Sequence, residues 1–176
     1  IKAIECEMDK LGLKFNSEKS VCMLFQDKIK ELQGEPIIFL NNSRLKFVDS
    51  FKYLGYFLTC DLSEKEDMMR CKRELLAKSY SVLRKFSATN TPGLLYLYKT
   101  FCLQLYGPNL WYKNKIKKTD LNELSVAYHS ALKRVMGMSK RESNHYACEI
   151  TNTYICRHFI NLKKILFVYD LFHKPF

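Results

Sequence analysis

The stretch Asp61-Leu62-Ser63-Glu64-Lys65-Glu66 decides the fold, because the spacing of apolar residues changes there. Upstream of it, short apolar runs separated by polar turns are typical of β-strands. Ser63 and Glu66 have the spacing of a capping box, which predicts that a helix begins at this point. Downstream, apolar residues recur at helical spacing. The sequence therefore predicts an α+β fold, in which a small helix-and-strand piece precedes an all-helical bundle.

The residues before Asp61 are expected to form one helix and a few antiparallel strands. The helical pattern of residues 1–11 ends at Gly12, which suits a helix C-cap. Gly55 lies inside the last predicted strand, where a glycine often marks a bulge or the close approach of a ligand. The strands are predicted over residues 21–25, 37–40, 45–48 and 51–59, with 41–44 as a hairpin turn.

After Asp61 the sequence predicts helices that Gly and Pro separate. The first runs to about residue 88, and Thr91-Pro92 begins another that Gly107-Pro108 ends or kinks. Further helices are expected over 119–137, 145–150 and 153–173, and the domains over 1–61, 62–142 and 143–176. The apolar residues of the second helix are expected to form a packed face; they are Leu94, Leu95, Leu97, Phe101 and Leu105.

The excess positive charge lies in one segment. The chain has a formal net charge of +11, and residues 68–141 contain 15 lysines and arginines against three acidic residues. The rest of the chain contains 14 basic and 15 acidic residues. A basic segment interleaved with aromatic residues is typical of proteins that bind a phosphate backbone and stack on bases. A solvated helical surface beside core aromatics is the alternative.

Composition indicates a protein of the cell interior, nuclear or cytoplasmic, with no membrane partner. No apolar run reaches the ~18 residues that span a bilayer, and the N-terminus lacks the apolar region of a signal peptide. Seven cysteines would leave one unpaired, and their surroundings suit buried thiols in a reducing compartment. Because the chain begins without a methionine and inside a helical pattern, we expect it to be a fragment of a longer protein.

Two motifs are more specific than composition. Gly12-Leu13-Lys14-Phe15-Asn16-Ser17-Glu18-Lys19-Ser20 reads as a helix end followed by a polar turn, and Phe51-Lys52-Tyr53-Leu54-Gly55-Tyr56-Phe57-Leu58 follows it. A segment from Leu105-Tyr106-Gly107 to Leu110-Trp111 lies downstream. In this order, the three resemble the last part of the reverse transcriptase encoded by non-LTR retrotransposons. That family carries a gly-leu-x-x-asn-x-x-lys-ser/thr turn before a phe-x-tyr-leu-gly primer grip.

The resemblance spans nearly the whole chain and implies a role for each part. Residues 1–61 would be the end of the polymerase palm with the primer grip, 62–142 the basic thumb, and 143–176 a helical extension. Lys19 would be an accessory general acid toward the departing pyrophosphate, although it also suits a plain exposed turn lysine. The expected nucleic-acid-binding residues are Phe51, Tyr53, Gly55, Arg70, Lys72, Arg73, Lys78, Arg84 and Lys85. The partners implied are an RNA or DNA template–primer and the missing catalytic part of the polymerase.

The chain departs from the family at the catalytic centre. Such polymerases need carboxylates that hold two metal ions, and the family supplies them upstream of the helix that begins this chain. The sequence contains no Asp-Asp pair, and Glu66-Asp67 lies in a first helical turn, where acids offset the helix dipole. We therefore expect no catalytic residue and no cofactor in this chain, Mg²⁺ in the complete polymerase, and no activity from the chain alone.

Other chemistries have weaker signals. Cys148, Cys156 and His158 lack the spacing of a zinc site, so no metal is expected. The sequence contains neither a phosphate-binding loop nor a dinucleotide fingerprint. The alternative function is that of a repurposed retroelement remnant acting as a protein-interaction module, because a tail separated from its catalytic core would expose apolar surface.

Overall fold

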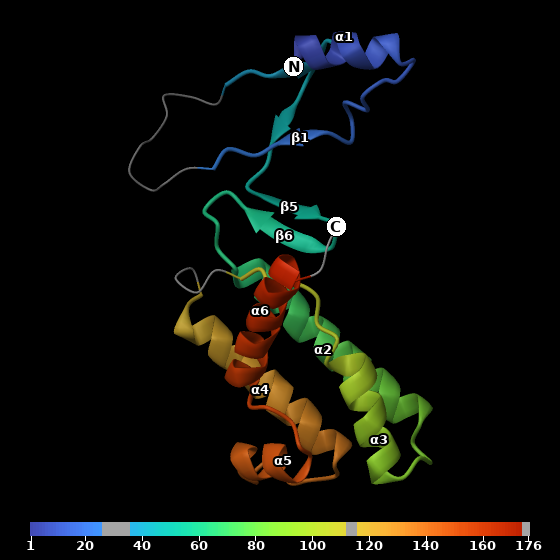
Figure 1. The fold of residues 1–176 in the computed structure, drawn as a ribbon, viewed down its shortest axis with the longest axis vertical. Helices are drawn as coiled ribbons and strands as arrows, with labels where there is room; N and C mark the ends of the chain where they lie inside the picture. The colour runs from blue at the N-terminus through green and yellow to red at the C-terminus, as the bar shows by residue number, and fades with distance from the viewer. Residues whose placement is uncertain (26–35, 112–115, 174–176) are drawn as a thin grey trace. The chain divides into compact units, whose positions relative to one another are not determined.

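The computed structural model describes residues 1–25, 36–111 and 116–173, and forms two compact units, Ile1–Ser63 and Glu64–Phe176 (Figure 1). Helices and short strands are both present, which agrees with an α+β fold. Over the described residues, unit 1 contains one helix and the strands, and unit 2 contains only helices. Unit 1 ends two residues after Asp61, where the sequence pattern changes.

Unit 1 begins with helix α1 (Lys2–Lys10), which ends as its sequence predicts. Gly12 has φ +68°, and its N–H donates to the Asp9 carbonyl while that of Leu13 donates to Met8, both at 3.0 Å. These two bonds form a Schellman motif, which requires a left-handed residue at the position of Gly12. The C-cap prediction is therefore confirmed.

Side-chain hydrogen bonds join α1 to the neighbouring loops. The backbone N–H of Asn41 donates to Glu5 Oε1 at 2.6 Å, and the Asn41 side-chain amide donates to the Phe15 carbonyl at 2.7 Å. Burial contributes less than these hydrogen bonds to holding α1 in place, because no side chain of α1, all of which is described, is fully buried. Leu40 and Leu45 are the buried aliphatic residues of the described part of this unit.

The strands of unit 1 form three pairs over its described residues. Strand β1 (Val21–Cys22) pairs with β4 (Lys46–Phe47), β2 (Phe39–Leu40) with β3 (Ser43–Arg44), and β5 (Ser50–Tyr53) with β6 (Tyr56–Thr59). The β1–β4 pair is parallel, so the expectation of antiparallel strands alone was wrong. The residue pattern of a strand indicates which face is buried but not the direction of its partner.

The single strand predicted over residues 51–59 is a hairpin instead. Tyr53 pairs with Tyr56, and the two residues between them, Leu54 and Gly55, have φ +47° and +86°. Positive φ at both central residues defines a two-residue type I′ turn, which matches the twist of the flanking strands. The prediction failed because leucine rarely adopts positive φ and gives no turn signal. Gly55 is therefore a turn residue and not a bulge.

The β2–β3 hairpin agrees more closely with the turn that the sequence predicts. Asn41 and Asn42 have φ +48° and +60° and join β2 to β3, with Leu40 paired to Ser43. Asparagine tolerates the left-handed region, which is why this turn could be predicted. The turn is tighter than the expected 41–44, because residues 43–44 already belong to β3.

Unit 2 is a helical assembly of the kind that the sequence predicts. Its helices are α2 (Lys65–Lys85), α3 (Thr91–Leu97), the π-helical turn η1 (Tyr98–Cys102), α4 (Lys118–Val135), α5 (Asn144–Ile150) and α6 (Cys156–His173). Asn90 caps α3 by accepting the Gly93 N–H at 3.0 Å, and Pro92 lies in its first turn, as predicted. Helix α2 begins after Glu64 and not after Ser63. The Ser63 N–H instead donates to Thr59 Oγ1 and Asp61 Oδ1, both at 2.9 Å.

Buried aromatic residues connect the helices of unit 2. The Tyr98 hydroxyl donates to the Tyr128 carbonyl at 3.2 Å, and the Tyr128 hydroxyl donates to the Tyr154 carbonyl at 2.8 Å. Burial raises the pKa of both phenols, so both remain neutral donors. Because Tyr128 also packs against Phe159, at 5.7 Å between ring centroids, α6 shares the core of unit 2.

Candidate nucleic-acid interface

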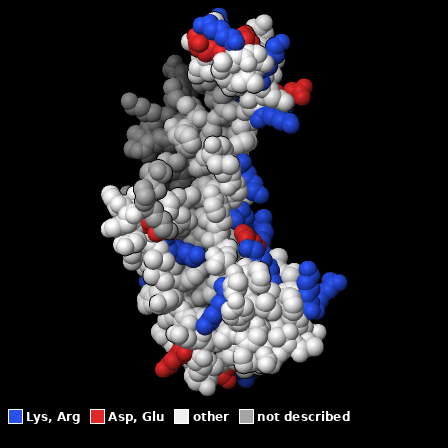
Figure 2. Space-filling view, turned by 45° about the vertical axis from the view of Figure 1, so that its right-hand side comes forward, with Lys and Arg blue, Asp and Glu red and all other residues white. Residues whose placement is uncertain are grey.

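Figure 2 shows lysines and arginines at several separate places on the face that it presents. Within unit 2, the six basic residues expected to bind nucleic acid all lie on α2, but their contacts differ. They fall into three pairs: Arg70 with Lys72, Lys78 with Lys85, and Arg73 with Arg84.

Ion pairs within unit 2 engage Arg70 and Lys72. Arg70 Nε lies 2.7 Å from Asp67 Oδ1, Nη1 lies 2.8 Å from Glu74 Oε2, and the same guanidinium donates to the Tyr106 carbonyl. Lys72 Nζ lies 2.9 Å from Glu123 Oε2 of α4. These cations therefore hold α2 to its neighbours, and phosphate contact would compete with those bonds.

Lys78 and Lys85 lie on one side of α2, where they border a groove of about 560 Å³ that we call the α2–η1 groove. Seven residues separate them, which is two helical turns. Lys78 also contacts Glu74 at 2.6 Å and the Gln104 carbonyl at 3.4 Å. None of the described residues that line the groove is acidic. The groove is lined by Ala77, Lys78, Ser81, Val82, Lys85, Phe86, Thr100, Phe101 and Gln104.

Two phenylalanines make the groove suitable for bases or sugars. Phe86 is 43% exposed and Phe101 is 55% exposed, although both are large apolar side chains. Phe101 was predicted to belong to a packed helix face, and this prediction was wrong. The π-helical turn η1 changes the register of the helix, so that Tyr98 and Cys102 are buried and Phe101 is exposed. No residue in this part of the sequence indicates a π-helical turn.

Arg73 and Arg84 lie on another side of α2, with Tyr80 between them in the helical register. Both arginines are exposed, and Tyr80 is stacked under Arg134 of α4, whose guanidinium carbon lies 4.5 Å from the ring centroid. This cation–π contact joins α2 to α4. The structure thus places the pair on a different face from the α2–η1 groove.

In unit 1, the proposed primer-grip motif forms the exposed β5–β6 hairpin. Phe51 is 38% exposed, Tyr53 58% and Leu54 76%, while Gly55 is half-buried within the turn. The Lys52 ammonium lies 5.9 Å from the centroid of the Phe57 ring on the paired strand. An exposed tip with two aromatic rings leaves their faces accessible for stacking or sugar contact.

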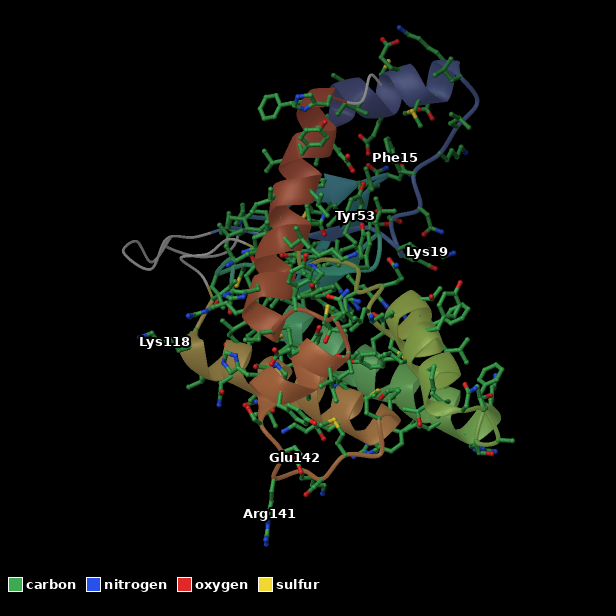
Figure 3. All side chains as sticks on the ribbon, turned by 60° about the horizontal axis from the view of Figure 1, so that its bottom comes forward. Phe15, Lys19, Tyr53, Lys118, Arg141 and Glu142 are labelled. Atoms are coloured by element: carbon green, nitrogen blue, oxygen red, sulfur yellow. The ribbon has the colours of Figure 1, made fainter. Side chains whose placement is uncertain are left out.

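Lys19 lies in a turn that Asn16 organises. The Asn16 side chain accepts the Lys19 backbone N–H at 3.1 Å, and the Asn16 carbonyl accepts the Ser20 hydroxyl at 2.8 Å. The Lys19 side chain is exposed and extends away from the ribbon (Figure 3). The asparagine of the motif therefore has a structural task, which is to shape the turn that presents the lysine.

The described residues give no metal centre. Over residues 1–25, 36–111 and 116–173, no three His, Cys, Asp or Glu side chains are grouped so that they could hold an ion. Cys148 and Cys156 lie in the core beside Tyr128, and burial raises the pKa of both thiols. None of the helices in the described part of the chain is both long and apolar enough to cross a membrane.

Comparison with known proteins does not identify this chain. No family model, no curated protein and no solved structure matches it.

Proposed function

We propose that this chain binds primed nucleic acid through the α2–η1 groove. The observation that carries the proposal is the lining of this groove. Two lysines lie beside two exposed phenylalanines, and none of the described lining residues is acidic. Lys85 would contact phosphate, Lys78 would do so in competition with its ion pair to Glu74, and Phe86 and Phe101 would pack on sugars or bases. Such contacts read the backbone and shape of a duplex and not its sequence.

The motif resemblance supports a narrower form of this proposal. The chain would be the template–primer-binding portion of a retroelement RNA-directed DNA polymerase, with unit 1 as the end of the palm and unit 2 as the thumb and helical extension. The exposed aromatic residues of the β5–β6 hairpin suit a primer grip. The catalytic carboxylates and their Mg²⁺ ions would belong to a separate segment.

The test is a binding titration with a fluorescent RNA–DNA hybrid that carries a recessed 3′ end. We expect binding to weaken with salt at a log–log slope of about −3 to −5, because each phosphate contact contributes ~0.9. Lys85→Gln and Phe101→Ala should each weaken binding about five- to tenfold. Arg141→Gln is the matched control, because Arg141 is exposed and extends away from the ribbon (Figure 3). Absence of binding at about 50 mM salt, or equal effects of all three variants, would contradict the proposal.

Lys19 permits a separate test of the polymerase context. The chain alone should not extend a primer, whereas a mixture with a catalytic palm segment of the same element should. In that mixture Lys19→Ala should slow extension about tenfold or more, because a general acid typically contributes 10²–10⁴. Lys14→Ala is the control, since Lys14 is also exposed and lies five residues before Lys19. Extension by the chain alone would refute this assignment.

Unit 1 favours a second candidate, a protein-interaction module. Many large apolar side chains of this unit are exposed, which is unusual for a small unit that has no partner. Size-exclusion chromatography after nuclease treatment distinguishes the two: a nucleic-acid-free dimer that ignores the hybrid would support this candidate. The large exposed apolar residues in the described part of unit 1 are Ile1, Ile4, Leu11, Leu13, Phe25, Ile37, Phe39, Phe51, Tyr53, Leu54 and Leu62.

A further inference from the structure

The carboxylate of Glu74 bridges two basic side chains of α2. Its Oε1 lies 2.6 Å from Lys78 Nζ, and its Oε2 lies 2.8 Å from Arg70 Nη1. Lys78 lines the α2–η1 groove, whereas Glu74 does not belong to the described lining. The acid therefore acts on the groove through a lysine that a phosphate would also need.

Arg70 fixes the position of Glu74. Its guanidinium also donates to the Tyr106 carbonyl and to the carboxylate of Asp67, which is 0% exposed. A guanidinium held by this many bonds keeps Glu74 in place when Lys78 moves. The lysine, by contrast, carries a compact charge on a flexible stem and can turn toward another anion.

The ion pair offsets the charge that Lys78 would offer to a phosphate. The side chains of Lys78 and Glu74 are 35% and 29% exposed, so solvent screens this pair less than a fully exposed one. Lys78 also donates to the Gln104 carbonyl at 3.4 Å, which engages a second of its three donors. A phosphate at Lys78 would thus replace an existing anion, and the exchange gains less than binding at a lysine without a carboxylate partner.

We propose that Glu74 competes with nucleic acid for Lys78 and so lowers the affinity of the α2–η1 groove. The inference rests on the proposed function, because it concerns the same groove. Since Arg70 retains the carboxylate, its negative charge stays near any phosphate that Lys78 contacts. The groove therefore holds a strand less tightly at Lys78 than at Lys85.

The test is a double-mutant cycle, measured by titration of the full chain with the fluorescent RNA–DNA hybrid. Glu74→Gln should tighten binding about three- to fivefold, the scale of a partly exposed ion pair. The log–log slope with salt should become steeper by about 0.5–0.9, because Lys78 then contributes a full phosphate contact. Lys78→Gln should weaken binding less than about twofold in the unaltered chain, and about three- to fivefold when combined with Glu74→Gln.

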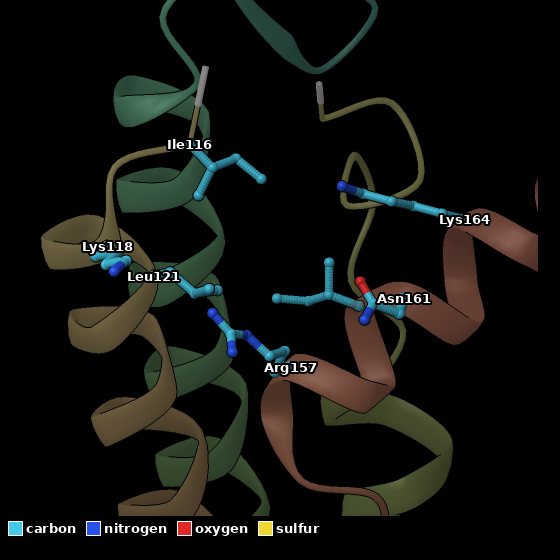
Figure 4. A pocket seen from close by; sticks show the side chains of 7 residues that line it. Ile116, Lys118, Leu121, Arg157, Asn161 and Lys164 are labelled. Atoms are coloured by element: carbon cyan, nitrogen blue, oxygen red, sulfur yellow. The ribbon is translucent and has the colours of Figure 1, made fainter. Parts of the chain in front are cut away.

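Two controls separate the pair from general effects of charge. Glu149→Gln, in an exposed acid of α5, should change the affinity less than about twofold. Arg157→Gln should leave the gain from Glu74→Gln intact. Arg157 lines a separate cavity of about 440 Å³ between the beginning of α4 and the first turns of α6 (Figure 4), which shares no lining residue with the groove. Glutamine at position 74 keeps an oxygen that can accept from Arg70, and circular dichroism checks that the variant folds.

The outcomes distinguish this inference from the proposed function. Absence of binding by the unaltered chain and by every variant would contradict both. Binding by the unaltered chain that Glu74→Gln leaves equal or weakens would overturn the inference alone, as would a gain that persists with Lys78→Gln or that Glu149→Gln matches. A loss of fivefold or more from Lys78→Gln alone would overturn it whether or not Glu74→Gln folds.

Discussion

The indole Nε1 of Trp111 donates a hydrogen bond to Asp67 Oδ2 at 2.8 Å, across 44 residues of sequence. Both side chains are almost fully buried. The same carboxylate accepts from Arg70, so one acid connects the first turn of α2 to the segment before α4. Trp111 therefore has a structural role in unit 2.

Removing that carboxylate should destabilise unit 2. Asp67→Asn leaves the Arg70 guanidinium without its buried partner, and we expect a loss of about 2–3 kcal/mol in the free energy of unfolding. The neighbouring Glu66→Gln should cost no more than about 1 kcal/mol, because Glu66 is exposed in the first turn of α2, where solvent weakens charge interactions. Urea unfolding followed by fluorescence measures both, since Trp111 is the sole tryptophan. Equal losses would contradict the structural role of Asp67.

The turn of the β5–β6 hairpin should become more stable when asparagine replaces Leu54. At φ +47° a leucine is strained, and Leu54→Asn should stabilise the hairpin by about 1 kcal/mol. Gly55→Ala, at φ +86°, should destabilise it by a similar amount. Amide hydrogen exchange of the paired residues Lys52 and Phe57 reports the local change. Faster exchange in Leu54→Asn than in the unaltered chain would show that the turn is not strained.

His129 should make unit 2 less stable in acid. Burial, with smaller effects from Lys133 and His145, holds the pKa of this histidine below its ordinary value of about 6.5, although its bond to the Ser125 carbonyl opposes the shift. The unfolded chain therefore binds the proton more readily. The stabilisation is complete above about pH 6.5 and falls as the pH decreases through the folded pKa, by at most about 1.4 kcal/mol per pH unit.

Two variants isolate that contribution. His129→Gln should reduce the loss of stability between about pH 7 and 5.5, measured by urea unfolding at each pH. His158→Gln is the control, because His158 is exposed on α6. If the two variants have the same pH profile as the unaltered chain, the titration of His129 does not contribute.

The thiols should differ sharply in reactivity. All seven cysteines, each within the described residues, are free. Burial raises the pKa of Cys71 and Cys156 to about 12 and that of Cys102 to about 11, so their reactive thiolates are scarce. Cys6 is exposed on α1 and should react first with a maleimide, whereas the buried thiols should react only after unfolding. Peptide mass spectrometry gives the order, and early labelling of Cys71 would contradict the packing of α2.

Local signals in the sequence were sufficient for much of the fold. Gly12, the Asn41–Asn42 pair and Pro92 each mark a helix end, a turn or a helix start through their own backbone preferences, and the structure has each feature where it was expected. The change from strands to helices near Asp61 follows from the period of the apolar residues, which is also a local property.

Features that depend on distant contacts could not be predicted. The type I′ turn at Leu54 opposes the residue's own preference, and η1 exposes Phe101 against the apolar pattern. The contact of Arg70 with the Tyr106 carbonyl, across 36 residues of sequence, engages a side chain that the family resemblance implies for nucleic-acid binding. The cavity at Arg157 combines residues from two helices far apart in the sequence, so no motif could signal it.

The most direct test of nucleic-acid binding is a photo-crosslink from the groove. A chain with p-benzoylphenylalanine in place of Phe101 should crosslink to the primed RNA–DNA hybrid, and the yield should fall as salt increases. The same substitution at Tyr146, an aromatic residue of α5 that is 51% exposed, should give little product. Efficient crosslinking from position 101 alone is the predicted result. Equal yields from both positions, or none from position 101, would contradict the assignment of the α2–η1 groove.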